Sequence, residues 1–315
     1  MPKLSVVASA ARSPLAKLVD DYLAAARAAG ASPKTIRFGY GFPLKEVFLP
    51  WAADAGITQA AQVDNRVLDR FAVHLREHGG KRGQLSEHSI WTYVKAVNRF
   101  VRWLKEEGEE VKAEGRKLPK LPKKLVTLLS REDIARLEAT AATERDKLIV
   151  RVLADTGIRV GELVMLRIND FEEQGGNYFL KVRGKGRRER LAPLDRTLYC
   201  RLRRYADHRP GDSDRLFLAL RRSASGDHPP LTENGIQQMV RDLAERAGLQ
   251  QRVTPHVFRH SAATWMLRRG MNPLLVAQVL GHSSLDMIQN VYSHLTPVDA
   301  HRQLMEALRS DRDEH

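Results

Sequence analysis

The sequence is that of a strongly basic chain of 315 residues. Its 52 lysines and arginines exceed its 38 aspartates and glutamates, which gives a formal net charge of +14 and favours a polyanionic partner, nucleic acid first. Hydrophobic residues make up 43% of the chain, enough to exclude wholesale disorder, and the length predicts two domains.

No stretch approaches the roughly 18 apolar residues of a spanning helix and no signal-peptide core is present, so we expect a cytoplasmic protein without a membrane partner. The one cysteine, Cys200, excludes a disulfide framework and a cysteine-based metal site, and we expect it to be a half-buried helix residue.

Four amphipathic helices are predicted in the first third of the chain. The first begins at Ser13 and Pro14, a good capping pair, and its apolar residues recur at helical spacing until Gly30. Similar starts follow at Ser32, Asp64 and Ser86. Residues 13–111 are therefore predicted to form a small helical bundle.

The second and fourth of these helices begin with hydroxyl and basic side chains, which suit DNA phosphates near a helix N-terminus. For any single residue, a plain solvated helix face is an equally good interpretation. The candidate DNA-binding residues on these helices are Lys34, Thr35, Arg37, Ser89, Thr92, Lys95 and Arg99.

Residues 112–128 are predicted to be a basic interdomain linker. The stretch KAEGRKLPKLPKK holds six basic residues, one acidic residue and two prolines, which prevent a continuous helix. A linker lying along DNA would be charged in this way, although a solvated tether would be as well. Lys120, Lys123 and Lys124 are the candidate DNA contacts here.

The C-terminal part is predicted to be helical with a small antiparallel sheet. Helices are expected from Ser130 to about Thr140 and from Thr143 to Gly157. Residues 177–194 have two β-prone arms around a GKG turn, which predicts a hairpin. Further helices are expected to start at Thr232, at Thr254 with Pro255, and at Asn272 with Pro273. The fold class is thus mostly α in two domains, a helical bundle followed by an α+β domain over residues 129–297, and a tail of residues 298–315 that could form one more helix.

Four segments, in this order, resemble the tyrosine recombinase (phage integrase) family. They are LADTGIRVGELVML at 153–166, VRGKGRRERLAPL at 182–194, TPHVFRHSAATWML at 254–267 and LGHSSLDMIQNVYSHL at 280–295. Each segment alone is weak, but the ordered set is specific. The resemblance implies a SAM-like core-site-binding bundle, a catalytic domain, and a site-specific recombinase that is either Xer-like or a mobile-element integrase.

The resemblance assigns two arginines and a histidine to the scissile phosphate. Arg159 and Arg259 match the family's two phosphate-gripping arginines, and a guanidinium offers a planar, always charged fork to the equatorial oxygens. His256 lies three residues before Arg259, so both would share one face of a helix. By resemblance His256 assists deprotonation of the nucleophile, and Glu162 props the site, although a plain surface ion pair is an alternative for Glu162.

The remaining catalytic candidates are Lys185, His282 and Tyr292. Tyr292 matches the nucleophile, whose phenol needs activation by nearby cations and a base. His282 matches a phosphate-contacting position, and its ten-residue spacing to Tyr292 looks more like phage and transposon integrases than the Xer type. Lys185, at the hairpin turn, matches the lysine that protonates the departing 5′ oxygen, with Lys181, Arg187 and Arg188 as rivals.

The function implied is strand cleavage and rejoining through a 3′-phosphotyrosine and a Holliday junction, for integration or excision of a mobile element or for resolution of DNA dimers. Neither a metal nor another cofactor should be needed. The implied partners are a double-stranded recombination site, a homotetramer on two such sites, and an accessory DNA-bending or directionality protein. A type IB topoisomerase and a non-catalytic DNA-binding regulator are the alternatives. Since the predicted helices begin near residue 13, we expect no arm-binding domain.

Overall fold

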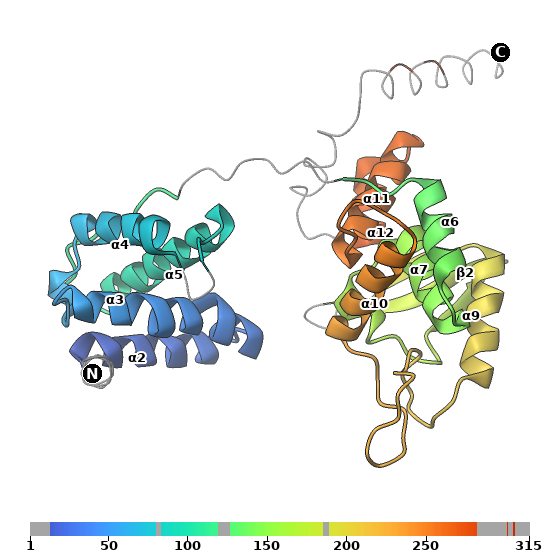
Figure 1. The fold of residues 1–315 in the computed structure, drawn as a ribbon, viewed down its shortest axis with the longest axis horizontal. Coiled ribbons are helices and arrows are strands. Elements are labelled where there is room, and N and C mark those ends of the chain that lie inside the picture. The colour runs from blue at the N-terminus through green and yellow to red at the C-terminus, as the bar shows by residue number, and fades with distance from the viewer. Residues whose placement is uncertain are drawn as a thin grey trace. The chain divides into compact units, whose positions relative to one another are not determined.

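The structure is a computed structural model that describes residues 13–79, 83–118, 127–184 and 189–281, together with His301 and Met305. The chain divides into two compact units, residues 1–124 and 125–315. The first unit is a set of helices and the second combines helices with a three-stranded antiparallel sheet (Figure 1). The predicted fold class is confirmed. No helix in the described part of the chain is long and apolar enough to cross a membrane.

The described part of the first unit is a bundle of helical segments. They are α2 (Pro14–Ala28), η1 (Thr35–Phe48), α3 (Leu49–Asp54), η2 (Ala60–Gln62), α4 (Asn65–His78) and α5 (Glu87–Glu106). Side-chain oxygens of Ser13, Asp64 and Ser86 accept the backbone N–H three residues later, at 3.1, 2.8 and 3.2 Å, so the helices begin where the capping pattern predicts. The apolar faces of these helices meet in one core.

The helix predicted to begin at Ser32 has an unexpected form. From Thr35 to Phe48 it is a π-helix, in which each N–H bonds a carbonyl five residues earlier, and it runs directly into α3. Pro43 lies inside it and has no N–H to donate. The pattern of apolar residues predicts which face is buried, but it does not distinguish an α-helix from this wider form.

The first residues of the predicted linker pack against the first unit. Ala113 is fully buried, and its N–H donates to the carbonyl of Val63 at 2.9 Å. The Arg116 guanidinium bonds the carboxylate of Asp69 on α4. Residues 119–126, which include the predicted DNA contacts Lys120, Lys123 and Lys124, lie outside the described residues.

The second unit contains a three-stranded sheet and seven helices among its described residues. The helices are α6 (Arg131–Thr140), α7 (Glu144–Thr156), α8 (Val160–Leu163), α9 (Arg196–His208), α10 (Glu233–Arg246), α11 (Pro255–Arg268) and α12 (Pro273–Leu280). The strands are β1 (Phe171–Gln174), β2 (Asn177–Arg183) and β3 (Glu189–Leu194), with β2 in the centre. The predicted hairpin and the predicted helix starts are confirmed. Strand β1 was not predicted, because FEEQ is short and shows no apolar alternation.

The expectation that Cys200 is half-buried is wrong. Cys200 is exposed on α9. The helix buries Leu198 and Leu202, and a residue two positions from each of them points to the opposite face.

Helix α7 lies in the middle of the second unit, packed against α6, α9 and α11. It ends at Gly157, whose φ of +61° is the left-handed conformation that closes helices. The space around Gly157 is filled by Ala262 of α11 and Leu280 of α12. This close approach brings the C-terminal ends of α7 and α12 against the middle of α11 at the site described below.

Gly157→Ala should destabilise the second unit. An added Cβ would lie 2.6 Å from Leu280 Cδ2 and 3.0 Å from Ala262 Cβ, in a backbone conformation that side chains disfavour. Strain and crowding together predict a loss of about 2–4 kcal/mol in the free energy of unfolding, measurable by urea denaturation. Gly226→Ala is the matched control, since its φ is +86° and nothing lies within 4 Å of the added Cβ. Equal losses in both variants would contradict the role of crowding at Gly157.

Candidate active site

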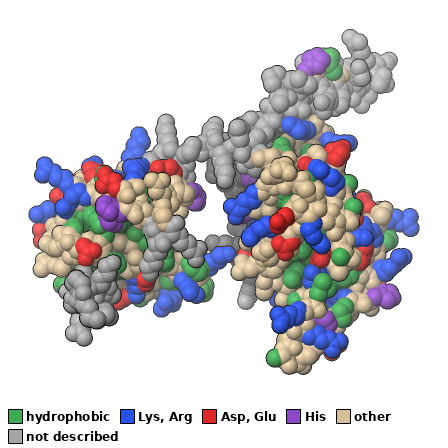
Figure 2. All heavy atoms as spheres, viewed as in Figure 1, with side chains coloured by type: hydrophobic (Ala, Val, Ile, Leu, Met, Phe, Trp, Pro, Cys, Tyr) green, Lys and Arg blue, Asp and Glu red, His purple; other side chains and the backbone are tan. Residues whose placement is uncertain are grey.

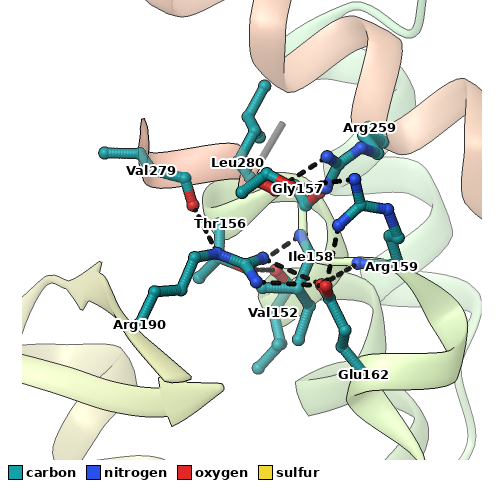
Figure 3. Close-up of polar contacts among 11 residues, drawn as sticks. Val152, Thr156, Gly157, Ile158, Arg159, Glu162, Arg190, Arg259, Val279 and Leu280 are labelled. Carbon is teal, nitrogen blue, oxygen red and sulfur yellow. Dashed lines mark hydrogen bonds and ion pairs between the residues drawn. The ribbon is translucent and has the colours of Figure 1, made fainter. Parts of the chain in front are cut away.

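The C-terminal end of α12 is bound by three arginines from different elements (Figure 3). The last carbonyls of a helix have no intrahelical partner and carry the negative end of its dipole. Arg190 Nε, Arg259 Nη2 and Arg159 Nη2 donate to the carbonyls of residues 279, 280 and 281 respectively, at 2.9, 2.7 and 3.0 Å. These bonds hold strand β3, helix α11 and the turn after α7 at one point.

Glu162 is the negative charge among these arginines. Its carboxylate accepts hydrogen bonds from Arg190 Nη1 and Nη2 at 3.0 and 2.8 Å, and from Arg159 Nη1 and the Arg159 backbone N–H at 2.8 Å each. The side chain is only 5% exposed, so the alternative of a plain surface ion pair is wrong. Burial raises the pKa of Glu162, but these hydrogen bonds outweigh it, and the net pKa is lowered from its ordinary value. Glu162 is therefore ionised and orients both arginines.

Arg259 is buried beneath this cluster, with 3% of its surface exposed. Its Nη1 donates to the carbonyl of Gly157 at 2.7 Å, in addition to its bond at residue 280. Burial and the positive charge of Arg159 lower the pKa of Arg259 to about 9. The guanidinium is still protonated at neutral pH, and an anion bound beside it would offset the cost of holding that charge out of water.

A cleft of about 1590 Å³ opens beside the cluster. Its wall carries six arginines: Arg159, Arg183, Arg190, Arg241, Arg252 and Arg259. Three glutamates also line it: Glu162, Glu189 and Glu233. His256, exposed at the second position of α11, lies on the wall together with Arg259. The excess of positive charge fits a phosphodiester better than a neutral ligand, and the described residues hold no cluster of three or more His, Cys, Asp or Glu for a metal ion.

Three of the six predicted catalytic residues, Lys185, His282 and Tyr292, lie outside the described residues. The chain on both sides of the hairpin turn, Arg183 with Gly184 and Glu189, lines the cleft, and Gly281 does so immediately before His282. Lys181, a rival of Lys185, pairs with Glu172 at 2.9 Å. That pairing makes Lys181 a poorer candidate.

Arg190 was missed by the sequence analysis, although a pattern could have found it. In the hairpin Leu180 pairs with Ala192, and Val182 pairs with Arg190. The side chains of Leu180, Val182 and Ala192 are fully buried. Arg190 therefore occupies a core-facing position of β3. An arginine at such a position requires a buried acid, which here is Glu162.

Six of the predicted DNA-binding residues of the first unit lie on η1 and α5, which pack against each other. Three of the cations rest on aromatic rings: Arg37 on Phe38 at 5.1 Å, Lys95 on Trp91 at 4.3 Å and Arg99 on Tyr40 at 5.6 Å. Lysine and arginine side chains are visible on the faces of both units, with acidic side chains among them (Figure 2).

The hydroxyl candidates of the first unit make local bonds. Thr35 Oγ1 lies 2.9 Å from Ser32 Oγ, and Ser89 Oγ lies 2.9 Å from Ser86 Oγ. The Thr92 hydroxyl donates to the carbonyl of His88 at 2.8 Å. Lys34 is exposed just before η1.

Comparisons with known proteins agree with this geometry. The model described as "Phage integrase family" matches residues 127–298. Tyrosine recombinase XerA of Pyrococcus horikoshii is 33% identical over 270 residues, 85% of each chain. Tyrosine recombinase XerC of Oceanobacillus iheyensis is 32% identical over 282 residues, which cover 84% of this chain and 87% of that one.

Two solved structures are similar in fold. The XerH site-specific recombinase bound to palindromic difH substrate, a post-cleavage complex, matches with a TM-score of 0.68 and 24% identity over 92% of this chain and 83% of that one. The Tn1549 transposon integrase in complex with transposon right end DNA matches with a TM-score of 0.66 and 19% identity over 93% and 99%. At these identities the two structures show a shared fold.

Glu162→Gln should lower the stability of the second unit most at neutral pH. Because the folded-state pKa of Glu162 lies below its ordinary value of 4.5, the carboxylate contributes stability above that pH, and this is lost as the pH falls through the folded-state pKa. We expect a loss of about 3–5 kcal/mol at pH 7, shrinking toward pH 3, in urea denaturation across that range. Glu173→Gln, at an exposed position of β1, is the control. A difference from wild type that does not change with pH would refute the ionised role of Glu162.

Proposed function

The chain belongs to the phage integrase family, and on this premise we propose that it is a site-specific DNA recombinase with Tyr292 as its nucleophile. The Tyr292 hydroxyl attacks a phosphodiester of the recombination site, forming a 3′-phosphotyrosine bond and releasing a 5′-hydroxyl. A 5′-hydroxyl from the partner DNA then attacks the phosphotyrosine, restores the phosphodiester and frees the tyrosine. The observation that carries the proposal is the cleft in which Arg159, Arg259 and His256 converge.

Arg159 and Arg259 bind the non-bridging oxygens of the scissile phosphate. Each is anchored to the carbonyl end of α12, so neither must be ordered when DNA binds. The Arg159 side chain is 41% exposed and lines the cleft although two of its nitrogens are engaged, and a guanidinium has five N–H groups, so donors remain for a phosphate. Fixed guanidinium groups in a partly desolvated cleft stabilise the charge that develops in the transition state.

The other candidates supply proton transfer and support. His256 lies at the N-terminal end of α11, where helix N–H groups also favour an anion, and it assists deprotonation of Tyr292. Lys185 protonates the departing 5′ oxygen, and His282 donates a hydrogen bond to the phosphate. Glu162 is a positioning residue, since its carboxylate accepts hydrogen bonds from Arg159 and Arg190.

We further propose that four copies join two DNA sites through a Holliday junction in the cytoplasm, with the tail of residues 298–315 docking on a neighbouring copy and an accessory protein bending the DNA. The reaction would serve integration or excision of a mobile element or resolution of DNA dimers. The first unit binds the flanking DNA through Arg37, Lys95 and Arg99. An aromatic ring holds each of these cations in place without neutralising it, which leaves the charge available to phosphates.

Tyr292→Phe should bind its DNA site as tightly as the wild type and form no covalent complex, because only the nucleophilic oxygen is removed. A nicked duplex traps the cleaved intermediate, and a denaturing gel measures the protein–DNA adduct. Tyr178→Phe, a change on strand β2, serves as the control and should form the adduct normally. An adduct formed by Tyr292→Phe would reject the nucleophile.

Lys185→Ala should cleave ordinary DNA poorly but recover much of its rate on a substrate with sulfur at the bridging 5′ position. Sulfur leaves as a thiolate with a pKa near that of cysteine, about 8.5, so it scarcely needs a proton. Arg159→Ala is the matched comparison and should recover far less, because the charge on the non-bridging oxygens is unchanged. Single-turnover cleavage rates measure both. Equal recovery of the two variants would contradict Lys185 as the general acid, and Arg187 and Arg188 would then be the candidates for that role.

A further inference from the structure

Two phenylalanines are exposed on helix η1 of the first unit. Phe38 is 57% exposed and Phe42 is 45% exposed. They lie four residues apart, so in a helix with bonds to the fifth preceding residue they fall on nearly the same face. Large apolar side chains gathered on a surface commonly mark a contact with a partner.

Cations held on aromatic rings lie on η1 and on α5, which packs against it. The Arg37 guanidinium lies 5.1 Å from the ring of Phe38, and the ring of Phe42 lies 6.1 Å from that of Tyr93 on α5. On α5, Lys95 rests on Trp91, and Arg99 donates to the Tyr40 hydroxyl of η1 at 3.0 Å. Among the described residues Lys45 of η1, Arg76 and Arg116 pair with carboxylates, whereas Arg37, Lys95 and Arg99 form no ion pair there. The surface of η1 and α5 therefore combines uncompensated positive charge with exposed apolar rings.

We infer that Phe38 and Phe42 contact the 5-methyl groups of thymines in the major groove of the recombination site, an inference that rests on the proposed function. The thymine methyl is the apolar group that unmodified DNA presents in this groove, which is wide enough to admit a helix. The flanking phosphates would meet Arg37, Lys95 and Arg99. A second copy of this chain is a poorer occupant, because it would bring its own net charge of +14 to a basic face.

The two kinds of contact divide the work of recognition. The cations bind any sequence through its phosphates and set the position of η1 on the duplex. The two rings discriminate, because a base without a methyl leaves each of them in contact with water or with a polar base edge. Phe38 and Phe42 thus determine specificity at a small number of thymine positions.

The test uses the full-length protein and the DNA site that it selects from a randomised duplex library. Each thymine of the selected site is replaced in turn by deoxyuridine, which removes only the methyl group. Wild type should lose about fourfold in affinity at each contacted position, the effect of exposing one methylene-sized group to water. Phe38→Ala and Phe42→Ala should bind the thymine site more weakly and show no further loss at the position that each ring contacts. Val73→Ala, a change at a similarly exposed residue on α4, should leave the pattern of wild type unchanged.

Three results would overturn the inference: wild type indifferent to deoxyuridine, variants that keep the discrimination of wild type, or variants that bind single sites normally but fail to join two. The last would identify a second copy of the chain as the occupant. Covalent complex formation on a nicked version of the selected site is measured in parallel. If the wild type forms a normal adduct but does not distinguish thymine from deoxyuridine, only the role of the rings is refuted. If it distinguishes the two bases but forms no adduct, the proposed nucleophile is refuted.

Discussion

The bonds between three arginines and the C-terminal carbonyls of α12 are the interaction on which the rest of the site depends. They connect strand β3, the turn after α7 and helix α11, which are far apart in sequence. Arg190 is the link that reaches the hairpin, and Glu162 joins it to Arg159. The chain continues from α12 to His282 and from β3 back to Lys185, so the same contacts determine where both of these segments start.

The charges of this cluster do not balance. Arg159, Arg190 and Arg259 share one carboxylate, that of Glu162, and the pKa of Arg259 is lowered first by burial and then by repulsion from Arg159. A buried cluster of like charges stabilises a fold poorly, since the cost of removing ions from water is repaid only by good pairing. It binds an anion well for the same reason. The phosphodiester supplies the negative charge that the cluster lacks. It does so at its non-bridging oxygens, where charge develops during cleavage.

The sequence analysis predicted those features that depend on local chemistry. Caps such as Ser130 and stops such as Gly157 placed the helices, because a side chain that bonds a free N–H and a residue that tolerates positive φ act within a few residues. It did not predict the burial of Arg190, whose acid partner lies 28 residues earlier in the chain. The prediction that Cys200 is half-buried was wrong because its exposure depends on which face of α9 meets the core. The role of Lys185 stays a prediction from the family resemblance.

The central claim is that Arg259 neutralises charge on the scissile phosphate and is not only a clamp on α12. A methylphosphonate at the scissile position tests this most directly, because a methyl group replaces one charged non-bridging oxygen. If the account is right, Arg259→Ala will form more covalent complex on a nicked methylphosphonate site than on the ordinary phosphodiester, whereas the wild type will form more on the phosphodiester. If Arg259→Ala gains nothing on the neutral substrate, its role is to hold α12, and the assignment of the phosphate to this cluster is contradicted.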